Sequence, residues 1–214
     1  GRETNNLLVA AGYTPMAIGA LNPRDTDILQ QSLVATLRGF DPFPSAIIDR
    51  SGDVKMVNRG WVEILGNRVS SFHQDTDFNL MDIFFAEEGL RRYMDNWEDG
   101  ICALLVTMQQ DVFIYQDPAA IANLQRYLKD PDLPADWQVR GANLLTLSGM
   151  YLQLSLPGDK TRNYIVVINT VGSERFIPDP MLMIFSVFPQ DEEVADDWQA
   201  RLRGNIYKHP LLSY

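Results

Sequence analysis

Residues 41–58 read Asp-Pro-Phe-Pro-Ser-Ala-Ile-Ile-Asp-Arg-Ser-Gly-Asp-Val-Lys-Met-Val-Asn, and this stretch decides the fold. Its two prolines end any preceding helix, because proline lacks a backbone N–H and restricts the residue before it. An apolar run at 46–48 is followed by turn residues at 49–53, where Gly52 can take a positive φ. Alternating residues then continue to Asn58. The pattern predicts a β-hairpin with strands at 45–49 and 54–58.

Helices are expected on both sides of the hairpin. Asn22 and Pro23 are typical of a helix start, and leucines then repeat every fourth residue towards Gly39. After the hairpin, Asn58 can cap a helix that ends at Gly66. A polar stretch at 67–77 is interpreted as a loop. Further helices are expected at 4–11, 79–85, 87–110, 118–130 and 191–203.

From Leu144 onward the apolar period changes from helical to strand-like. The pattern predicts three more strands, at 150–156, 163–171 and 181–188. Five strands, split two and three around a helical insert, indicate one antiparallel sheet. We therefore expect an α+β fold, with a PAS-like five-stranded antiparallel sheet, helices on one face and an N-terminal helical segment.

Composition narrows the function. The chain has 28 acidic and 18 basic residues, a net charge of −10. We do not expect it to bind DNA by itself, because nucleic-acid binding depends on Lys and Arg. No apolar run reaches the roughly 18 to 20 residues that span a bilayer, so no membrane partner is expected. The single cysteine, Cys102, excludes a disulfide framework within the chain and favours the cytoplasm.

Little in the sequence points to catalysis, so we do not expect an enzyme. The two histidines, His73 and His209, fall in a predicted loop and a predicted tail. A nucleophile and its base must lie within hydrogen-bond reach of each other, and the sequence places no nucleophile beside either histidine. Cysteine and histidine spacings typical of metal sites are missing, as are Gly-rich nucleotide motifs. We expect no metal and no resident cofactor.

An apolar stripe on the helix expected at 87–110 suggests a different activity. Its residues repeat at steps of three and four: Leu90, Met94, Trp97, Ile101, Leu105 and Met108. Such a stripe is more often plain core, but large and adaptable side chains could also enclose an elongated apolar cavity for a small molecule. The candidate ligand-binding residues are Asn58, Trp61, Phe84, Arg91, Met94, Asn96, Trp97 and Ile101.

Four of these candidates have a second interpretation. Arg91 could bind a carboxylate through its planar guanidinium, or could form ordinary helical ion pairs with Glu87 and Asp95. Asn58 could line the cavity or only cap its helix. The pair at 96–97 could line the cavity or only pack.

Four blocks of the chain, in order, resemble the MmyB-like, XRE-family bacterial transcription regulators. They are Asn6-Leu7-Leu8-Val9-Ala10-Ala11-Gly12-Tyr13-Thr14-Pro15; Pro42-Phe43-Pro44-Ser45-Ala46-Ile47-Ile48-Asp49-Arg50; Gly89-Leu90-Arg91 with Asn96-Trp97-Glu98; and Phe188-Pro189-Gln190-Asp191. The resemblance implies a PAS-like domain that binds fatty-acid-like molecules, joined to a helix-turn-helix DNA reader that this chain lacks. It implies a linker segment at 1–39, the ligand-binding domain at 40–204 and a tail at 205–214.

We therefore expect an effector-binding domain of a transcription regulator, with an apolar, fatty-acid-like small molecule as its ligand. DNA would be a partner only through the upstream reader. A homodimer is expected, because helix-turn-helix regulators commonly read two half-sites. Two alternatives stay open: a protein-interaction module with a packed core, and a cofactor-dependent PAS sensor, in which His73 is the one plausible haem ligand.

Overall fold

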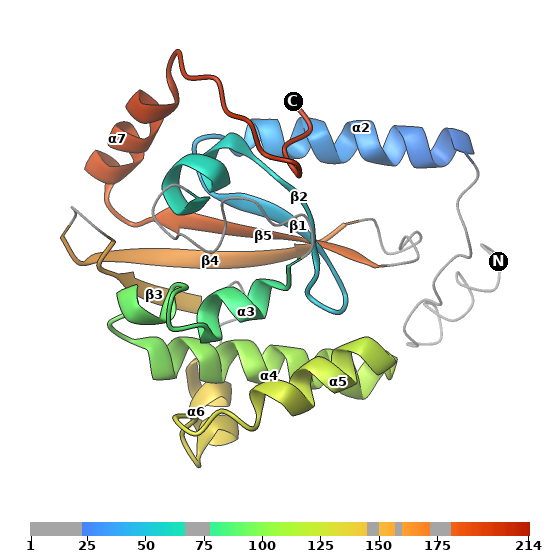
Figure 1. Ribbon diagram of the computed structural model, residues 1–214, viewed down its shortest axis with the longest axis vertical. Coiled ribbons are helices and arrows are strands. Elements are labelled where there is room, and N and C mark those ends of the chain that lie inside the picture. The colour runs from blue at the N-terminus through green and yellow to red at the C-terminus, as the bar shows by residue number, and fades with distance from the viewer. Residues whose placement is uncertain (1–22, 67–77, 145–149, 157–159, 172–180) are drawn as a thin grey trace.

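A single antiparallel sheet forms the centre of the molecule (Figure 1). The computed structural model describes residues 23–66, 78–144, 150–156, 160–171 and 181–214, so the helix predicted at 4–11 and the loop predicted at 67–77 lie outside the described residues. The strands are β1 (Ser45–Asp49), β2 (Val54–Val57), β3 (Met150–Leu154), β4 (Arg162–Thr170) and β5 (Leu182–Pro189), in the order β2-β1-β5-β4-β3. Each lies within two residues of its prediction, and the α+β class is confirmed.

The helices divide into those that were predicted and those that were not. Four were expected: α2 (Pro23–Gly39), α3 (Leu80–Phe85), α5 (Pro118–Tyr127) and α7 (Glu192–Leu202). The turn after the hairpin is π-helical, η1 (Trp61–Gly66). Helix α4 (Trp97–Tyr115) was predicted in part, over residues 97–110, whereas the 3₁₀ turn η3 (Arg91–Tyr93) and α6 (Trp137–Leu144) were not predicted.

The helix predicted at 87–110 was wrong in its first ten residues, because the chain there pairs with the edge strand β3. Asp95 donates its N–H to the carbonyl of Gln153 at 3.0 Å, and Ser155 donates to the carbonyl of Tyr93 at 2.7 Å. These bonds use backbone groups that a helix would need for itself. Segment 93–96 thus covers an edge that would otherwise present unpaired groups.

Helix α6 is absent from the prediction, which places no helix between residue 130 and the strand-like period that begins at Leu144. Its fit depends on Gly141, which lies against α4. A Cβ at this position would approach the carbonyl oxygen of Cys102 to 2.2 Å, so only glycine allows the two helices to come so close. That contact depends on tertiary packing, which a local pattern does not contain.

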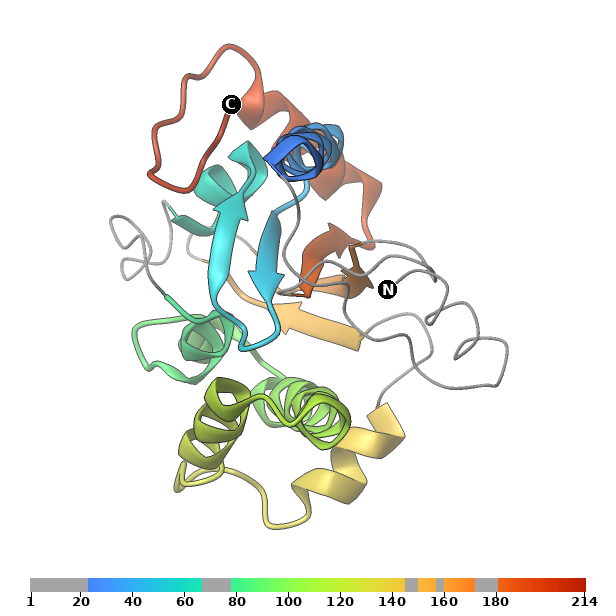
Figure 2. The same cartoon turned by 90° about the vertical axis from the view of Figure 1, so that its right-hand side faces the viewer.

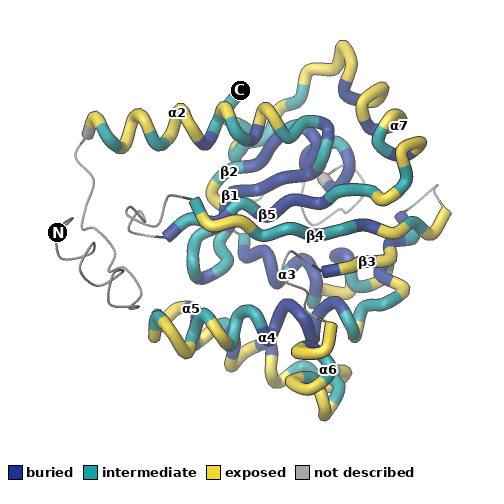
Figure 3. The backbone as a smooth tube through the Cα atoms, turned by 180° about the vertical axis from the view of Figure 1, so that it is seen from behind, coloured by how far each residue is buried: buried dark blue, intermediate teal, exposed yellow. Residues whose placement is uncertain are grey.

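Helices cover both faces of the sheet, and α2 lies on the side opposite α4, α5 and α6 (Figures 1 and 2). Adjacent residues of a strand point to opposite faces. Ile48 therefore belongs to the main core, which η1, α3, α4, α5 and α7 complete, whereas Ile47 packs against Leu33 and Leu37 of α2. Figure 3 shows the resulting gradient, with the central strands buried and the outer sides of α2, α5, α6 and α7 exposed.

Residues 205–214 return across the molecule and lie beside the outer strand β2. Val57 donates its N–H to the carbonyl of Leu211 at 3.0 Å, and it pairs with Leu212 in a short parallel bridge. The C-terminal residue Tyr214 reaches the end of α2, where the Arg38 guanidinium lies 4.8 Å from its ring centroid. The division of the chain at residues 39 and 204 stays a prediction.

Candidate ligand-binding cavity

The eight side chains predicted to bind ligand do not enclose a common cavity within the described residues. Four of them are buried in the main core: Trp61, Phe84, Met94 and Ile101. The rings of Trp61 and Phe84 both pack edge-on against Phe185, at centroid distances of 6.3 and 6.0 Å. The space that the sequence assigned to a ligand is therefore filled by side chains here, and a ligand role for these residues stays a prediction.

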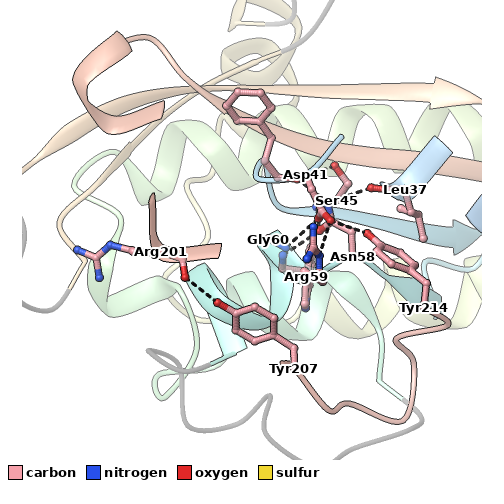
Figure 4. Close-up of polar contacts among 11 residues, drawn as sticks. Leu37, Asp41, Ser45, Asn58, Arg59, Gly60, Arg201, Tyr207 and Tyr214 are labelled. Carbon is pink, nitrogen blue, oxygen red and sulfur yellow. Dashed lines mark hydrogen bonds and ion pairs between the residues drawn. The ribbon is translucent and has the colours of Figure 1, made fainter. Parts of the chain in front are cut away.

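Asn58 is fully buried and all four of its side-chain hydrogen bonds go to the backbone (Figure 4). Its Oδ1 accepts from the N–H groups of Ser45 at 2.9 Å and Trp61 at 2.8 Å. Its Nδ2 donates to the carbonyls of Phe43 at 2.8 Å and Leu37 at 3.3 Å. The predicted cap is confirmed, and the same side chain joins α2, the hairpin and η1.

A second polar cluster beside Asn58 fastens the C-terminal segment (Figure 4). Asp41 Oδ2 accepts from Arg59 Nε at 2.8 Å and from the Tyr214 hydroxyl at 3.0 Å, while Oδ1 accepts from the N–H of Gly60 at 3.2 Å. Burial, followed by the nearby Asp41 charge, raises the pKa of Tyr214 above its usual value. The hydroxyl therefore remains a donor, and these bonds are structural.

Arg91 lies over the ring of Trp97, with its guanidinium carbon 4.0 Å from the ring centroid. Its Nη1 donates to Asp130 at 3.1 Å, and its Nη2 donates to Asp132. The predicted helical ion pairs were wrong: residues 91–93 form a 3₁₀ turn, and the described contacts of Asp95 go instead to residues 153, 155 and 161. The guanidinium that was expected to hold a carboxylate ligand already holds two carboxylates of the protein.

Asn96 and Trp97 also form hydrogen bonds within the protein. Asn96 Oδ1 accepts from the N–H of Gln153 at 2.7 Å and its Nδ2 donates to the carbonyl of Tyr151 at 3.2 Å, which extends the pairing along β3. Trp97 Nε1 donates to the carbonyl of Phe84 at 2.7 Å. Both observations favour the packing interpretation over the ligand interpretation.

A narrow hollow with apolar walls lies elsewhere, between α4 and the end of the sheet; we call it the α4 cavity. Its volume is about 60 Å³, enough for a few water molecules and below the roughly 300 Å³ at which small-molecule sites begin. Residues from the sheet, the hairpin turn, α3 and α4 line it: Ile48, Arg50, Ser51, Gly52, Leu80, Met81, Leu104, Thr107, Met108, Asp111, Ile168 and Met183. None of the eight predicted residues is among them.

Two wider hollows on the described surface have a different character. One, of about 400 Å³, is lined by side chains such as Asn96, Gln153 and Asn163. The other, of about 460 Å³, is lined by residues of α3, α5 and the segment after α5, and four of them are charged: Asp82, Arg126, Lys129 and Asp130. Both hollows have a larger share of polar groups in their walls than the α4 cavity has, so the α4 cavity fits an apolar ligand best despite its small size.

The polar end of the α4 cavity carries one cation. Arg50 lies over the ring of Tyr115, with the guanidinium carbon 3.9 Å from the ring centroid. Its Nε is buried without a hydrogen-bond partner, and the guanidinium forms no ion pair with any described residue. On the facing helix, burial raises the pKa of Asp111, and the Arg50 charge only partly offsets this rise. Within the described part of the chain, this arginine therefore has a donor without an acceptor and lines an apolar space.

The turn that carries Arg50 is held firmly. Asp49 Oδ1 accepts from the Ser51 hydroxyl at 2.7 Å and from the N–H groups of Ser51 and Asp53 at 3.0 Å. Burial alone would raise the pKa of Asp49, but hydrogen bonds from Lys55 and Ser51 outweigh it and hold the pKa below its usual value. Gly52 has φ of 89°, which suits glycine, so the turn presents Arg50 in a fixed direction.

Other chemistries receive little support from the described residues. They contain no cluster of three or more acidic, His or Cys side chains that could hold a metal ion, and no helix long and apolar enough to cross a membrane. Burial raises the pKa of Cys102 to about 11, which leaves an unreactive thiol. The suggested haem ligand, His73, lies outside the described residues.

Comparison with known proteins agrees with this architecture. No curated protein matches the chain. The sequence model of one family, described as the MmyB-like transcription regulator ligand binding domain, matches residues 29–175. The match begins inside α2 and contains β1 to β4, α3 to α6, and every cavity-lining residue except Met183. The chain therefore belongs to the family of MmyB-like transcription regulator ligand-binding domains.

Proposed function

We propose that this chain is the sensor domain of a bacterial transcription regulator and that it binds a fatty-acid-like molecule in the α4 cavity. The observation that carries the proposal is the combination of apolar walls with one lining arginine, Arg50, that pairs with no described residue. Small-molecule sites are typically apolar, with a few polar groups that fix orientation. The family is one of regulatory ligand-binding domains rather than of enzymes.

Entry of an alkyl chain requires the cavity to widen, and its composition suits this. Three of its lining residues are methionines, Met81, Met108 and Met183. Methionine has flexible, unbranched side chains that adapt to irregular contents. The cavity of about 60 Å³ would then be the closed form of a larger site, opened when the ligand displaces these side chains.

The sheet offers a route from the cavity to α2. Ile48 and Met183 line the cavity, whereas their neighbours Ile47 and Ile184 face α2 from the opposite side of the same strands. A ligand that shifts β1 or β5 would therefore also shift the surface on which α2 lies. Regulation requires unequal affinity of the ligand for the two arrangements. Residues upstream of α2 would connect this change to a helix-turn-helix DNA reader.

Three further predictions accompany this proposal: a homodimer, a cytoplasmic location, and contact with DNA only through the upstream reader. The dimer prediction rests on the two half-sites that such regulators commonly read. Analytical ultracentrifugation tests it directly, and a monomer at tens of micromolar, roughly the affinity scale of a weak dimer, would contradict tight self-association.

A protein-interaction module remains the second candidate, and one observation favours it. Phe113 and Ile114, near the end of α4, are 80% and 55% exposed, although both are large and apolar. A partner that covers them would need no cavity. In that case the purified domain would contain no small molecule and would gain no stability from fatty acids.

A pair of variants on one strand tests the ligand proposal. Ile168 lines the α4 cavity, while Ile165, also half-buried, points to the opposite face of β4. Ile168→Trp fills the cavity and should weaken decanoate binding by about tenfold or more, whereas Ile165→Trp should change it less than about twofold.

The measurement is isothermal titration with decanoate, together with native mass spectrometry and denaturing extraction of any small molecule that co-purifies. Thermal unfolding of both variants controls for overpacking, which costs typically about 1–3 kcal/mol. Equal loss of affinity in the two variants, or no binding by the wild type, would contradict a site in this cavity.

A further inference from the structure

The arginine side chains of this domain differ in how many of their N–H donors are bonded to described residues. Arg91, Arg126 and Arg140 each donate to carboxylates within the described residues. Arg50, in contrast, contacts an aromatic ring and makes no described hydrogen bond or ion pair. A guanidinium group that lines an apolar cavity and pairs with no described residue can offer N–H donors to a molecule from outside.

We infer that Arg50 anchors the head group of the ligand, and that this head group is a carboxylate with a single negative charge. This inference rests on the proposed function, because it assumes that a ligand occupies the α4 cavity. It assigns to Arg50 the role that the sequence suggested for Arg91.

Preorganisation supports this assignment. Tyr115 holds the guanidinium by a cation–π contact at 3.9 Å, and the hydrogen-bonded turn at 49–53 fixes the backbone from which the side chain extends. Asn79 and Asn123 add to this by donating to the Ser51 carbonyl at 2.7 and 3.1 Å. A donor group that is held in place before binding loses little entropy when the ligand arrives.

The charges around the cavity select a monoanion. Arg50 is the one cation that lines it, and Asp111 is the one carboxylate, among the described residues. The neighbouring Asp49 is already paired with Lys55 at 2.9 Å, so it does not compete for Arg50. A dianionic phosphate ester would meet one positive charge and the repulsion of Asp111, whereas a carboxylate needs only a single planar partner.

The test compares octanoate with 1-octanol, which share the chain and differ in the head group. Arg50→Gln should weaken the binding of octanoate by about ten- to hundredfold, because a charge-assisted hydrogen bond usually contributes that much to affinity. The affinity for octanol should change by less than about twofold. Arg92→Gln is the matched control, because Arg92 also lies on a tyrosine, 5.5 Å from the ring centroid of Tyr93, but outside the cavity. Arg92→Gln should change the affinity for neither ligand.

Each outcome of these titrations is decisive. Preferential loss of octanoate in Arg50→Gln supports the anchor, and the octanol titration shows that the variant still folds and still has its cavity. Equal affinity of the wild type for acid and alcohol, unchanged in Arg50→Gln, would overturn the anchor while leaving the cavity proposal intact. If the wild type binds neither octanoate, octanol nor decanoate, the proposed function itself fails, and the anchor fails with it.

Discussion

Two arginines of this domain lie over aromatic rings at almost the same distance, and they differ in their remaining contacts. Arg91 lies 4.0 Å from the Trp97 centroid and donates to two aspartates, whereas Arg50 lies 3.9 Å from the Tyr115 centroid and donates to no described residue. Arg91 thus links the 3₁₀ turn η3 to the segment after α5. Arg50 lines the α4 cavity. The comparison shows that the availability of donors, rather than residue type, separates a structural arginine from a candidate anchor.

The largest effect on stability is expected from substitution of Arg91. Arg91→Ala removes the partner of Asp130, whose side chain is only 15% exposed, and leaves it beside Asp132. An unpaired, partly buried charge should lower the free energy of unfolding by about 1–3 kcal/mol. Urea denaturation measures this loss, and octanoate affinity should stay unchanged.

The double variant with Asp130→Asn is the control for that experiment. If the two residues act as a pair, the second substitution adds little to the first, and the coupling energy exceeds about 0.5 kcal/mol. Weaker octanoate binding in Arg91→Ala, with stability intact, would reverse the roles that we assign to the two arginines.

A smaller effect is expected at Asp111. Its pKa is raised in the folded protein, mainly by burial, so the charged form is disfavoured there. A raised acid pKa means that folding is favoured at low pH and that this contribution is lost as the pH rises from the unfolded pKa through the folded one. Asp111→Asn should therefore raise the melting temperature at pH 7 and flatten its dependence on pH over that range.

Asp111→Asn also tests the role of Arg50, because Asp111 and Arg50 line the same cavity. Removing a like charge should strengthen octanoate binding by roughly threefold, since partly exposed charges interact by about 1 kcal/mol or less. Octanol is the control ligand and should not respond. Weaker octanoate binding in Asp111→Asn would mean that this carboxyl group donates to the ligand instead of repelling it.

Local patterns were sufficient for most of the sheet. The hairpin at 41–58 carries its own turn residues and alternation, and the three later strands show an apolar period that needs no distant information. Asn58 was also predictable as a cap, because that role depends on the residues that follow it directly.

The site was less predictable, because it depends on contacts between distant segments. Arg91 was favoured for its place beside an apolar stripe, but its partners Asp130 and Asp132 are about 40 residues away and their approach leaves no local signal. Arg50 was present in a quoted motif yet appeared to be an ordinary turn residue. Only the fold shows that Tyr115 and Asp111 meet it at a cavity.

The crystal structure of this domain grown with dodecanoate tests the central claim most directly. We predict an alkyl chain in the α4 cavity between Met81, Met108 and Met183, and a carboxylate oxygen about 2.7–2.9 Å from Arg50 Nε. Arg91 should still hold Asp130. A carboxylate bound to any other cation, or a chain that lies outside the cavity while Arg50 remains unpaired, would contradict the account.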